Sequence, residues 1–456
     1  MQLPALFSAL TDNLFASSSV WLAWFVSFEG MHLLLRFFST ALFVILVVPA
    51  WSASNPRASG GKAVLPAFDL LITNGRIVDG SGNPWFRADI GIKDGRIARL
   101  GRISPAEATK TIDAKGQIVA PGFIDVHTHV ESIYSLPAAE NFIRMGVTTL
   151  VTGNCGASAI DVARFLGRIK EKPLTVNLAT LIAHGSVRRE AMGSEDRGPT
   201  PDEMRKMEEL VEQGMKDGAV GLSTGLIYVP GTYAKTDEIT NLARIAARYG
   251  GVYATHMRSE GERVADAIRE SIQIGEQAGL PVEISHFKIS SKKLWGQTPM
   301  TIGLVREARA RGLMVTVDQY AYTASSTSLE SRMPGWLRAG GLEAARKRLA
   351  DPAMRERVVK EMKEGLKRNG FKDYSYAVVA NYQPDQSFNG KSIAEITQKV
   401  RGKRDVKNQI EQILAMYEAG GAGMIYHGMS EDDVQRIMRE PFTMIASDSG
   451  VRQQDE

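Results

Sequence analysis

The sequence predicts an α/β protein built on a (β/α)₈, TIM-like barrel. After Pro121-Gly122, short apolar runs alternate with helix patterns, which indicates βαβ units and a parallel sheet. There are eight such runs, the number that closes a barrel, and 456 residues accommodate one barrel with attachments. The expected strands are 123–129, 148–153, 175–182, 219–223, 252–257, 281–287, 314–320 and 442–447. The clearest amphipathic helix patterns between them are 201–217, 236–249 and 261–278.

A small β module is expected before the barrel, over residues 68–119. Short alternating runs are separated there by tight turns, and Asp94-Gly95 between apolar residues is a hairpin signal. We expect a β-sandwich whose C-terminal strands are missing. The barrel then occupies residues 120–456.

One long irregularity interrupts the barrel pattern. Residues 324–441 are rich in Lys, Arg and Glu and predict a helical insertion before the last strand. Its segment 422–429 is either an additional strand or a replacement for one of the eight.

The N-terminus carries an export signal pattern. Arg36 precedes the apolar run 41–48, and the small residues Ala50, Ser52 and Ala53 follow it. This order predicts a signal peptide over residues 31–53, starting at Met31, and a periplasmic or secreted protein. Residues 1–30 are then an upstream extension of uncertain status. The run is too short to span a bilayer, so no stable membrane span is expected after cleavage; the alternative is an uncleaved N-terminal anchor.

The composition argues against nucleic-acid binding and excludes an intramolecular disulfide. The net charge is only +4, with basic and acidic residues interleaved, so there is no stripe for nucleic acid. Cys155 is the single cysteine, which rules out an intramolecular disulfide. A lone cysteine is by default a buried, inert thiol, unless its surroundings indicate otherwise.

The residue pair His127 and His129 predicts a metal site. Alternate residues on a strand point to one face, so both imidazoles reach one cation where the first barrel strand ends. Active sites of this fold lie at that rim. Four more candidate metal-binding side chains lie at or just past the ends of other expected strands, namely Cys155, His256, His286 and Asp448. We interpret His32, His184 and His427 as structural or incidental, although His184 also follows a strand.

This ligand set favours zinc, which accepts imidazole, thiolate and carboxylate. Zinc lowers the pKa of bound water from about 15.7 to about 7 and polarises a carbonyl. Asp448 is then the expected general base, which later donates the proton to the leaving nitrogen. Its alternative is a turn residue in Ser447-Asp448-Ser449-Gly450. The sequence thus indicates a metal-dependent hydrolase of amide-like bonds acting on a small molecule.

The segment from Pro121 to His129, Pro-Gly-Phe-Ile-Asp-Val-His-Thr-His, resembles the first strand of the amidohydrolase superfamily. Within it, the chain is most similar to the N-acyl-D-amino-acid deacylases (D-aminoacylases), over roughly residues 68–450. The similarity rests on Gly153-Asn154-Cys155-Gly156, Thr255-His256-Met257-Arg258, Ser285-His286-Phe287-Lys288 and residues 318–326, Asp-Gln-Tyr-Ala-Tyr-Thr-Ala-Ser-Ser. A cysteine after the second strand, in place of a bridging lysine or glutamate, matches that family.

The resemblance implies specific roles. Cys155, His256 and His286 would hold a tight zinc, His127 and His129 would face a weaker second site, and Asp448 would be the catalytic acid and base. Lys288, Tyr320 and Ser326 match positions that bind the substrate carboxylate and carbonyl; the alternative is ordinary rim polarity, and Tyr322 lies on the same strand face as Tyr320.

The expected reaction is hydrolysis of an N-acyl-D-amino acid to a carboxylate and a free D-amino acid. The alternatives are a relative acting on D-dipeptides or on cyclic amides of the dihydroorotase and hydantoinase kind, against which Cys155 argues, and a truncated non-catalytic relative. The family carries an arginine about a dozen positions after the aspartate, whereas this sequence ends eight residues after Asp448, at Glu456. We therefore expect that arginine, the last barrel helix and half the small sheet to be missing, with exposed apolar surface and weak or absent activity.

Overall fold

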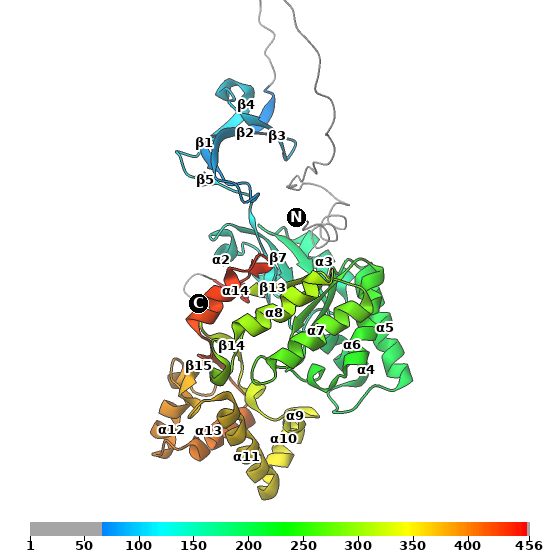
Figure 1. The fold of residues 1–456 in the computed structure, drawn as a ribbon, viewed down its shortest axis with the longest axis vertical. Coiled ribbons are helices and arrows are strands. Elements are labelled where there is room, and N and C mark those ends of the chain that lie inside the picture. The colour runs from blue at the N-terminus through cyan, green and yellow to red at the C-terminus, as the bar shows by residue number, and fades with distance from the viewer. Residues whose placement is uncertain (1–65, 454–456) are drawn as a thin grey trace, which may run out of the picture. The chain divides into compact units, whose positions relative to one another are not determined.

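The computed structural model describes residues 66–453. Within that range the chain divides into two compact units, residues 66–121 and residues 122–453, and each is described by itself (Figure 1). The expected signal peptide and the upstream extension lie outside the described residues. None of the helices in the described range is long and apolar enough to cross a membrane.

The first unit is a five-stranded sheet. Its order is β3-β2-β1-β4, with β5 also paired to β1, and β1 runs antiparallel to β2 but parallel to β4 and β5. The hairpin expected at Asp94-Gly95 joins β2 to β3, and both turn residues have the positive φ that such a turn requires. The described residues form one sheet and not the two facing sheets of the expected sandwich. Its strands are β1 (Phe68–Ile77), β2 (Phe86–Lys93), β3 (Arg96–Gly101), β4 (Ala108–Asp113) and β5 (Ile118–Val119).

The second unit contains parallel strands at all eight expected positions. They form a six-stranded sheet, β17-β13-β12-β11-β10-β9, and a three-stranded sheet, β6-β7-β8. β8 and β9 are consecutive and are separated only at Leu181, while the segments that follow β17 and β6 meet through a single bridge between Thr128 and Ser449. The ladder is therefore typical of a (β/α)₈ barrel but is not continuous around it. The strands are β6 (Phe123–Asp125), β7 (Val147–Thr152), β8 (Asn177–Thr180), β9 (Ile182–Ala183), β10 (Gly221–Gly225), β11 (Val252–His256), β12 (Val282–Ile284), β13 (Val315–Gln319) and β17 (Thr443–Ile445).

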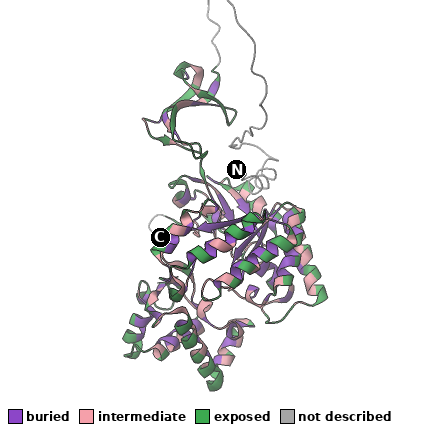
Figure 2. Cartoon of the chain, viewed as in Figure 1, coloured by how far each residue is buried: buried purple, intermediate pink, exposed green. Residues whose placement is uncertain are grey.

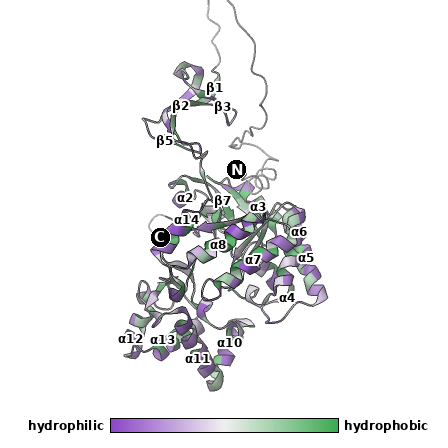
Figure 3. Ribbon diagram, viewed as in Figure 1, coloured by the Kyte–Doolittle hydropathy of each residue, from purple (hydrophilic) through white to green (hydrophobic). Residues whose placement is uncertain are grey.

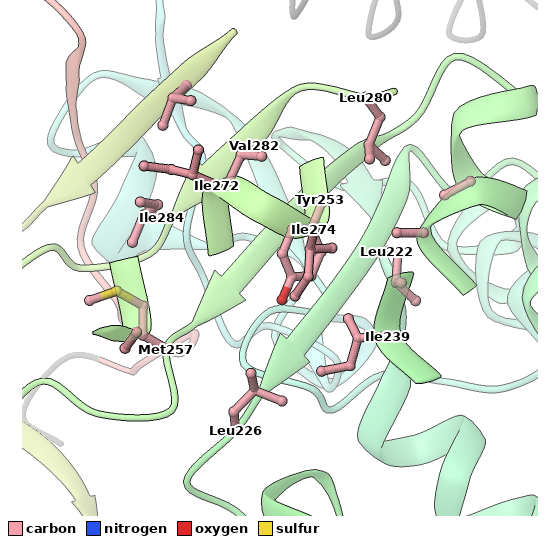
Figure 4. Packing of buried hydrophobic residues seen from close by; sticks show 14 of the residues in the cluster. Leu222, Leu226, Ile239, Tyr253, Met257, Ile272, Ile274, Leu280, Val282 and Ile284 are labelled. Atoms are coloured by element: carbon pink, nitrogen blue, oxygen red, sulfur yellow. The ribbon is translucent and has the colours of Figure 1, made fainter. Parts of the chain in front are cut away.

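Helices follow the strands and bury one face against them. Buried residues concentrate on the parallel strands, and hydrophobic and hydrophilic residues alternate around the turns of the outer helices (Figures 2 and 3). In the core, Leu222 and Tyr253 from the sheet pack with Ile239 and Ile274 from the helices (Figure 4). The helices are α2 (Glu140–Ile143), α3 (Val162–Glu171), α4 (His184–Met192), α5 (Pro201–Lys216), α6 (Thr236–Arg248), α7 (Val264–Ala278), α8 (Thr298–Ala310) and α14 (Glu431–Met438).

The region expected as a helical insertion also contains a small antiparallel sheet. Its order is β14-β16-β15, and β16 lies within the segment 422–429, which is thus an additional strand and displaces none of the eight. Side chains such as Leu329, Val379 and Tyr426 give this region a hydrophobic core of its own. Its elements are β14 (Ser325–Ser328), α9 (Gly335–Arg338), α10 (Gly341–Ala350), α11 (Pro352–Asn369), β15 (Ala377–Asn381), α12 (Ile393–Arg401), α13 (Val406–Glu418) and β16 (Gly423–Tyr426).

Candidate active site

Candidate metal-binding side chains from five different strands meet at one point. The parallel arrangement brings the carboxyl ends of strands to one rim, so residues far apart in sequence become neighbours there. Each of the expected ligands lies at or just after the end of its strand. They are His127 and His129 after β6, Cys155 after β7, His256 at the end of β11, His286 after β12, and Asp448 after β17.

The Cys155 thiol lies at the centre of this group. Its Sγ is 3.3 Å from Nε2 of His127, 3.6 Å from Nε2 of His286 and 3.7 Å from Nδ1 of His256. His127 is fully buried, and His256 and His286 are less than 5% exposed. Three imidazole nitrogens thus converge on one sulfur in a site largely closed to solvent.

These separations fit a tetrahedral zinc site. Zinc–sulfur bonds of about 2.3 Å and zinc–nitrogen bonds of about 2.0–2.1 Å, at the tetrahedral angle, put sulfur and nitrogen about 3.6 Å apart. The distances from Cys155 Sγ to His286 and His256 match that value, and the distance to His127 is slightly shorter. The donor set therefore suits zinc, and around the sulfur the ligand atoms of His127, Cys155 and His286 all lie within 4.8 Å of one another.

A second ligand group shares His127. Asp448 Oδ1 lies 3.4 Å from Nε2 of His127 and 3.2 Å from Nε2 of His129, and these three residues form a candidate metal-binding triad. The side chain of His129 is 34% exposed, whereas that of His127 has no exposed surface. The open side of the group therefore lies at His129.

The backbone at three of these ligands adopts the left-handed region. Cys155 has φ of 51°, His286 of 35° and Asp448 of 53°. Residues other than glycine adopt such values at a cost, and they concentrate where function requires a particular side-chain direction. The neighbouring Gly156 has no room for a side chain, because a Cβ there would lie 2.6 Å from the backbone nitrogen of Gly225.

Two carboxylates to which the sequence pattern assigns no role hold the imidazoles in place. Asp318, after which β13 ends, accepts a hydrogen bond from Nδ1 of His127 at 2.9 Å and another from the backbone N–H of His286 at 2.8 Å. Glu260 lies 3.0 Å from Nδ1 of His286. Such carboxylates fix the ring orientation and leave the opposite nitrogen for a metal. Their positions give some signal, because Asp318 lies in a predicted strand and Glu260 follows His256 by four residues.

The sequence profile of the amidohydrolase family matches residues 110–384. The chain belongs to this family.

Several known amidohydrolases are similar to most of the chain. The D-aminoacylase of Alcaligenes xylosoxydans xylosoxydans is 33% identical over 84% of this chain and 74% of its own length, and the N-acyl-D-glutamate deacylase of the same organism is 31% identical over 83% and 73%. A crystal structure of a D-aminoacylase superimposes with a TM-score of 0.69 at 32% identity, covering 83% of this chain and 75% of that one. The N-acyl-D-glutamate deacylase of Bordetella bronchiseptica, solved with zinc and a phosphonate inhibitor, gives 0.69 at 31% identity over 84% and 76%.

The charges of this amidohydrolase site compensate one another. Burial acts to raise the pKa of Cys155, but the charge of His127 and the hydrogen bonds with His127, His129 and His256 together lower this pKa well below its ordinary value. Burial acts to lower the pKa of His129, but its hydrogen bonds with Asp448 and Cys155 and the charge of Cys155 together raise the pKa to about 10. Burial lowers the pKa of His256. A thiolate is therefore available here, and zinc binding would displace the imidazole protons.

A cavity of about 780 Å³ opens onto the ligands, a volume in the usual range for small-molecule sites. Lys288, Tyr320 and Ser326, the expected substrate-binding residues, all line it. Tyr320 is 2% exposed and its hydroxyl has no hydrogen-bond partner, whereas Tyr322 is 57% exposed and does not line the cavity. The geometry therefore favours Tyr320 over Tyr322.

Lys288 is already engaged by the protein. Its Nζ lies 2.5 Å from Glu260, 2.9 Å from Nδ1 of His286 and 3.0 Å from the carbonyl oxygen of His286. The positive charge of Lys288 is thus matched by Glu260 before any ligand enters.

The remaining histidines lie outside the ligand group. His184 is fully buried and bonded through Nε2 to Glu238 at 2.8 Å, and Glu238 also pairs with the buried Arg188 at 3.0 Å. This network joins α4 to α6. His427 is exposed and does not line the cavity, and His32 lies outside the described residues.

Proposed function

We propose that this amidohydrolase uses zinc to hydrolyse the amide bond of N-acyl-D-amino acids, giving a carboxylate and a free D-amino acid. The observation that carries the proposal is the Cys155 thiol between three imidazole nitrogens, at separations that suit tetrahedral zinc. Two further facts support it: similar proteins include D-aminoacylases, and a similar N-acyl-D-glutamate deacylase was solved with zinc and a phosphonate inhibitor.

In this proposal Cys155, His256 and His286 would hold the tighter zinc, and His127, His129 and Asp448 would surround a weaker second position. Zinc supplies a hydroxide-like water at neutral pH and polarises the substrate carbonyl. Asp318 and Glu260 keep the His127 and His286 rings turned toward the metal.

Asp448 moves the proton. Burial acts to raise its pKa, but the charge of His127 and the hydrogen bond from His129 lower it, so the carboxylate is ionised and can accept a proton from the attacking water. The water oxygen bonds to the acyl carbon, the carbon–nitrogen bond breaks, and Asp448 returns the proton to the leaving amine. Tyr320 and Ser326, which line the same cavity, are placed to bind substrate oxygens.

Two structural points belong to the same proposal. We infer that the eight parallel strands close into a barrel, which is supported by the near-continuous run β8–β9 and by the Thr128–Ser449 bridge. The catalytic region would span 120–456 with the insertion at 324–441 and the module at 68–119. Export from the cytoplasm rests on the pattern of residues 31–53 alone.

The test is an assay of matched N-acetyl-D- and N-acetyl-L-amino acids with full-length protein, first depleted of metal and then reloaded with zinc. We expect any turnover that this chain supports, even if weak, to be confined to the D-enantiomers, restored by zinc and lost together with bound zinc in Cys155→Ala. Equal rates on both enantiomers would defeat the stereochemical assignment, and full zinc content in Cys155→Ala would defeat the ligand assignment. If the protein hydrolyses a D-dipeptide or a hydantoin but none of the acyl amino acids, its substrate class is that of the D-dipeptides or the cyclic amides.

A further inference from the structure

The net positive charge of the chain is concentrated in one short segment of the insertion. Residues 399–407 read Lys-Val-Arg-Gly-Lys-Arg-Asp-Val-Lys, with five basic residues and one acidic residue. The whole chain has 55 basic and 51 acidic residues, so the remainder has 50 of each. The segment 399–407, which we call the basic tip, therefore accounts for the entire net charge of +4. Its cations are Lys399, Arg401, Lys403, Arg404 and Lys407.

The fold exposes the basic tip as the turn of a helical hairpin. α12 ends at Arg401, Gly402 adopts a left-handed conformation with a φ of 66°, and α13 begins at Val406. Hydrogen bonds from Arg401 to Gln412 at 3.2 Å and to the carbonyl oxygen of Glu411 at 3.0 Å join the two helices. All five cations of the tip are exposed, and both helices lie away from the parallel strands (Figure 1).

The cations of the basic tip have no carboxylate partners. Across residues 66–453, none of the five takes part in an ion pair. Elsewhere in the insertion, Arg355, Arg357 and Arg368 each pair with a glutamate at 2.8–2.9 Å. The one acidic residue of the tip, Asp405, instead caps α13 by accepting a hydrogen bond from the backbone N–H of Asn408 at 3.1 Å. The protein therefore leaves the charge of the tip available to an external anion.

The shape and composition of the basic tip favour a broad anionic surface as its partner. Small molecules bind in concave sites, whereas the tip is an exposed turn and none of its residues lines the active-site cavity. Single-stranded nucleic acids stack their bases on aromatic side chains, and residues 391–410 contain no aromatic residue. Val400, which is 53% exposed, lies between two cations. An apolar side chain among lysines and arginines suits the boundary between lipid headgroups and acyl chains.

We propose that the basic tip binds this protein to the surface of an anionic lipid bilayer. Its lysines and arginines contact the headgroup phosphates, and Val400 lies at the headgroup boundary. Clusters of about four to eight basic residues bind anionic lipid surfaces through charge attraction. The contact is peripheral and requires no membrane-spanning segment. It is independent of the reaction proposed above, because no residue of the tip lines the active-site cavity.

The experiment is co-sedimentation of the full-length protein with lipid vesicles. One set contains phosphatidylcholine alone, and in the other about a third of the lipid is phosphatidylglycerol. We expect binding to the anionic vesicles that weakens as the salt concentration rises to about 1 M, where screening limits charge attraction to about 3 Å. Each cation near the surface contributes about fivefold in affinity, so the double variant Lys403→Gln and Arg404→Gln should bind about 25-fold more weakly.

Two further variants of the basic tip separate charge from local structure. The double variant Lys399→Gln and Lys407→Gln also removes two cations, so its affinity for the anionic vesicles should fall by a similar factor. Arg404→Lys keeps the charge and should bind as the wild type does. All these side chains are exposed, so the melting temperature should stay at the wild-type value in every variant.

The matched control is the double variant Arg205→Gln and Lys206→Gln. It removes the same charge from exposed residues of α5 that are paired, with Asp202 at 2.9 Å and Glu190 at 3.7 Å. Its affinity for the anionic vesicles should stay within about twofold of the wild type. The apolar run 41–48 would bind neutral and anionic vesicles alike, so the neutral vesicles measure its contribution.

Several results would overturn the proposal. They are a wild-type protein that binds neither kind of vesicle or binds both equally, tip variants that keep their affinity, and a control that loses as much as they do. A lower melting temperature in both tip variants would also count against it, because the lost binding would then reflect unfolding. Binding to a labelled DNA duplex that depends on the tip, without binding to vesicles, would make the partner a nucleic acid.

Discussion

Replacing Asp318 by asparagine tests how the metal ligands are oriented. The carboxylate accepts two hydrogen bonds with different oxygens, Oδ2 from the His127 ring at 2.9 Å and Oδ1 from the backbone N–H of His286 at 2.8 Å. Both Asp318 and His127 are fully buried, so water cannot replace a lost contact. Asparagine has only one acceptor oxygen, and its amide N–H would face another N–H at the second contact.

The expected loss of zinc affinity follows from the one hydrogen bond that asparagine cannot accept. Loss of one hydrogen bond to a charged group costs about 1.5–3 kcal/mol. A free-energy change of about 1.4 kcal/mol corresponds to a tenfold change in affinity. If the lost hydrogen bond is the one that orients the His127 ring toward the metal, zinc binding should therefore weaken by about 10–100-fold. Carboxylates behind metal-bound histidines contribute on this scale in other proteins.

The assay is zinc titration of the metal-free protein against a chromogenic chelator. The control is Asp433→Asn, because Asp433 is also buried and also accepts hydrogen bonds at both oxygens, from Gly296 at 2.8 Å, Thr298 at 2.5 Å and Arg436 at 3.0 Å, but touches none of the candidate ligands. We expect both variants to melt earlier and only Asp318→Asn to lose zinc affinity. Equal zinc affinity in Asp318→Asn and wild type would refute the reasoning.

Three further predictions concern the buried network of His184, Arg188 and Glu238, the turn at Cys155, and the role of Asp448 as proton carrier. Glu238→Gln should destabilise the protein by about 3–5 kcal/mol, as measured by denaturant unfolding, because it leaves the buried Arg188 without its counter-charge. Burial acts to raise the pKa of Glu238, but the hydrogen bonds and charges of His184 and Arg188 together outweigh this, so the pKa lies below the ordinary 4.5. The difference between wild type and variant should thus be full above pH 4.5 and shrink as the pH falls through the lowered pKa; a difference independent of pH would contradict this. Gly156→Ala should lower both melting temperature and zinc affinity, because the added Cβ would lie 2.6 Å from backbone nitrogen, whereas Gly279→Ala, with a similar positive φ and open space, should cost only about 1 kcal/mol; equal effects would argue against a tight Cys155 turn. Asp448→Asn should keep its tightly bound zinc and lose about 10²–10⁴-fold in kcat with a D-substrate, and retention of kcat would exclude Asp448 as the proton carrier.

The regular part of the fold is predictable because it depends on local patterns. Alternating apolar runs and helix patterns place all eight parallel strands, and helix boundaries such as Pro201–Lys216 follow from capping residues like Thr200 and Glu203. The β module is harder to predict, because its strand pattern does not say whether strands lie in one sheet or two. Side chains in the insertion depend on contacts between distant segments, so the small sheet that includes β16 is only an ambiguous run in the sequence.

The residues of the candidate site also differ in how far the sequence predicts them. Histidines and a lone cysteine are rare, and the amino-acid sequence alone places them at the ends of expected strands. Asp318 and Glu260 receive no role from the sequence, because carboxylates are common and their value lies in which ring they face.

The most direct test of the Cys155-centred site is zinc K-edge X-ray absorption of the reconstituted protein. The account predicts one sulfur ligand at about 2.3 Å beside nitrogen or oxygen ligands at about 2.0–2.2 Å, with the sulfur contribution lost in Cys155→Ala. A coordination sphere made only of nitrogen and oxygen in the wild-type protein would contradict it.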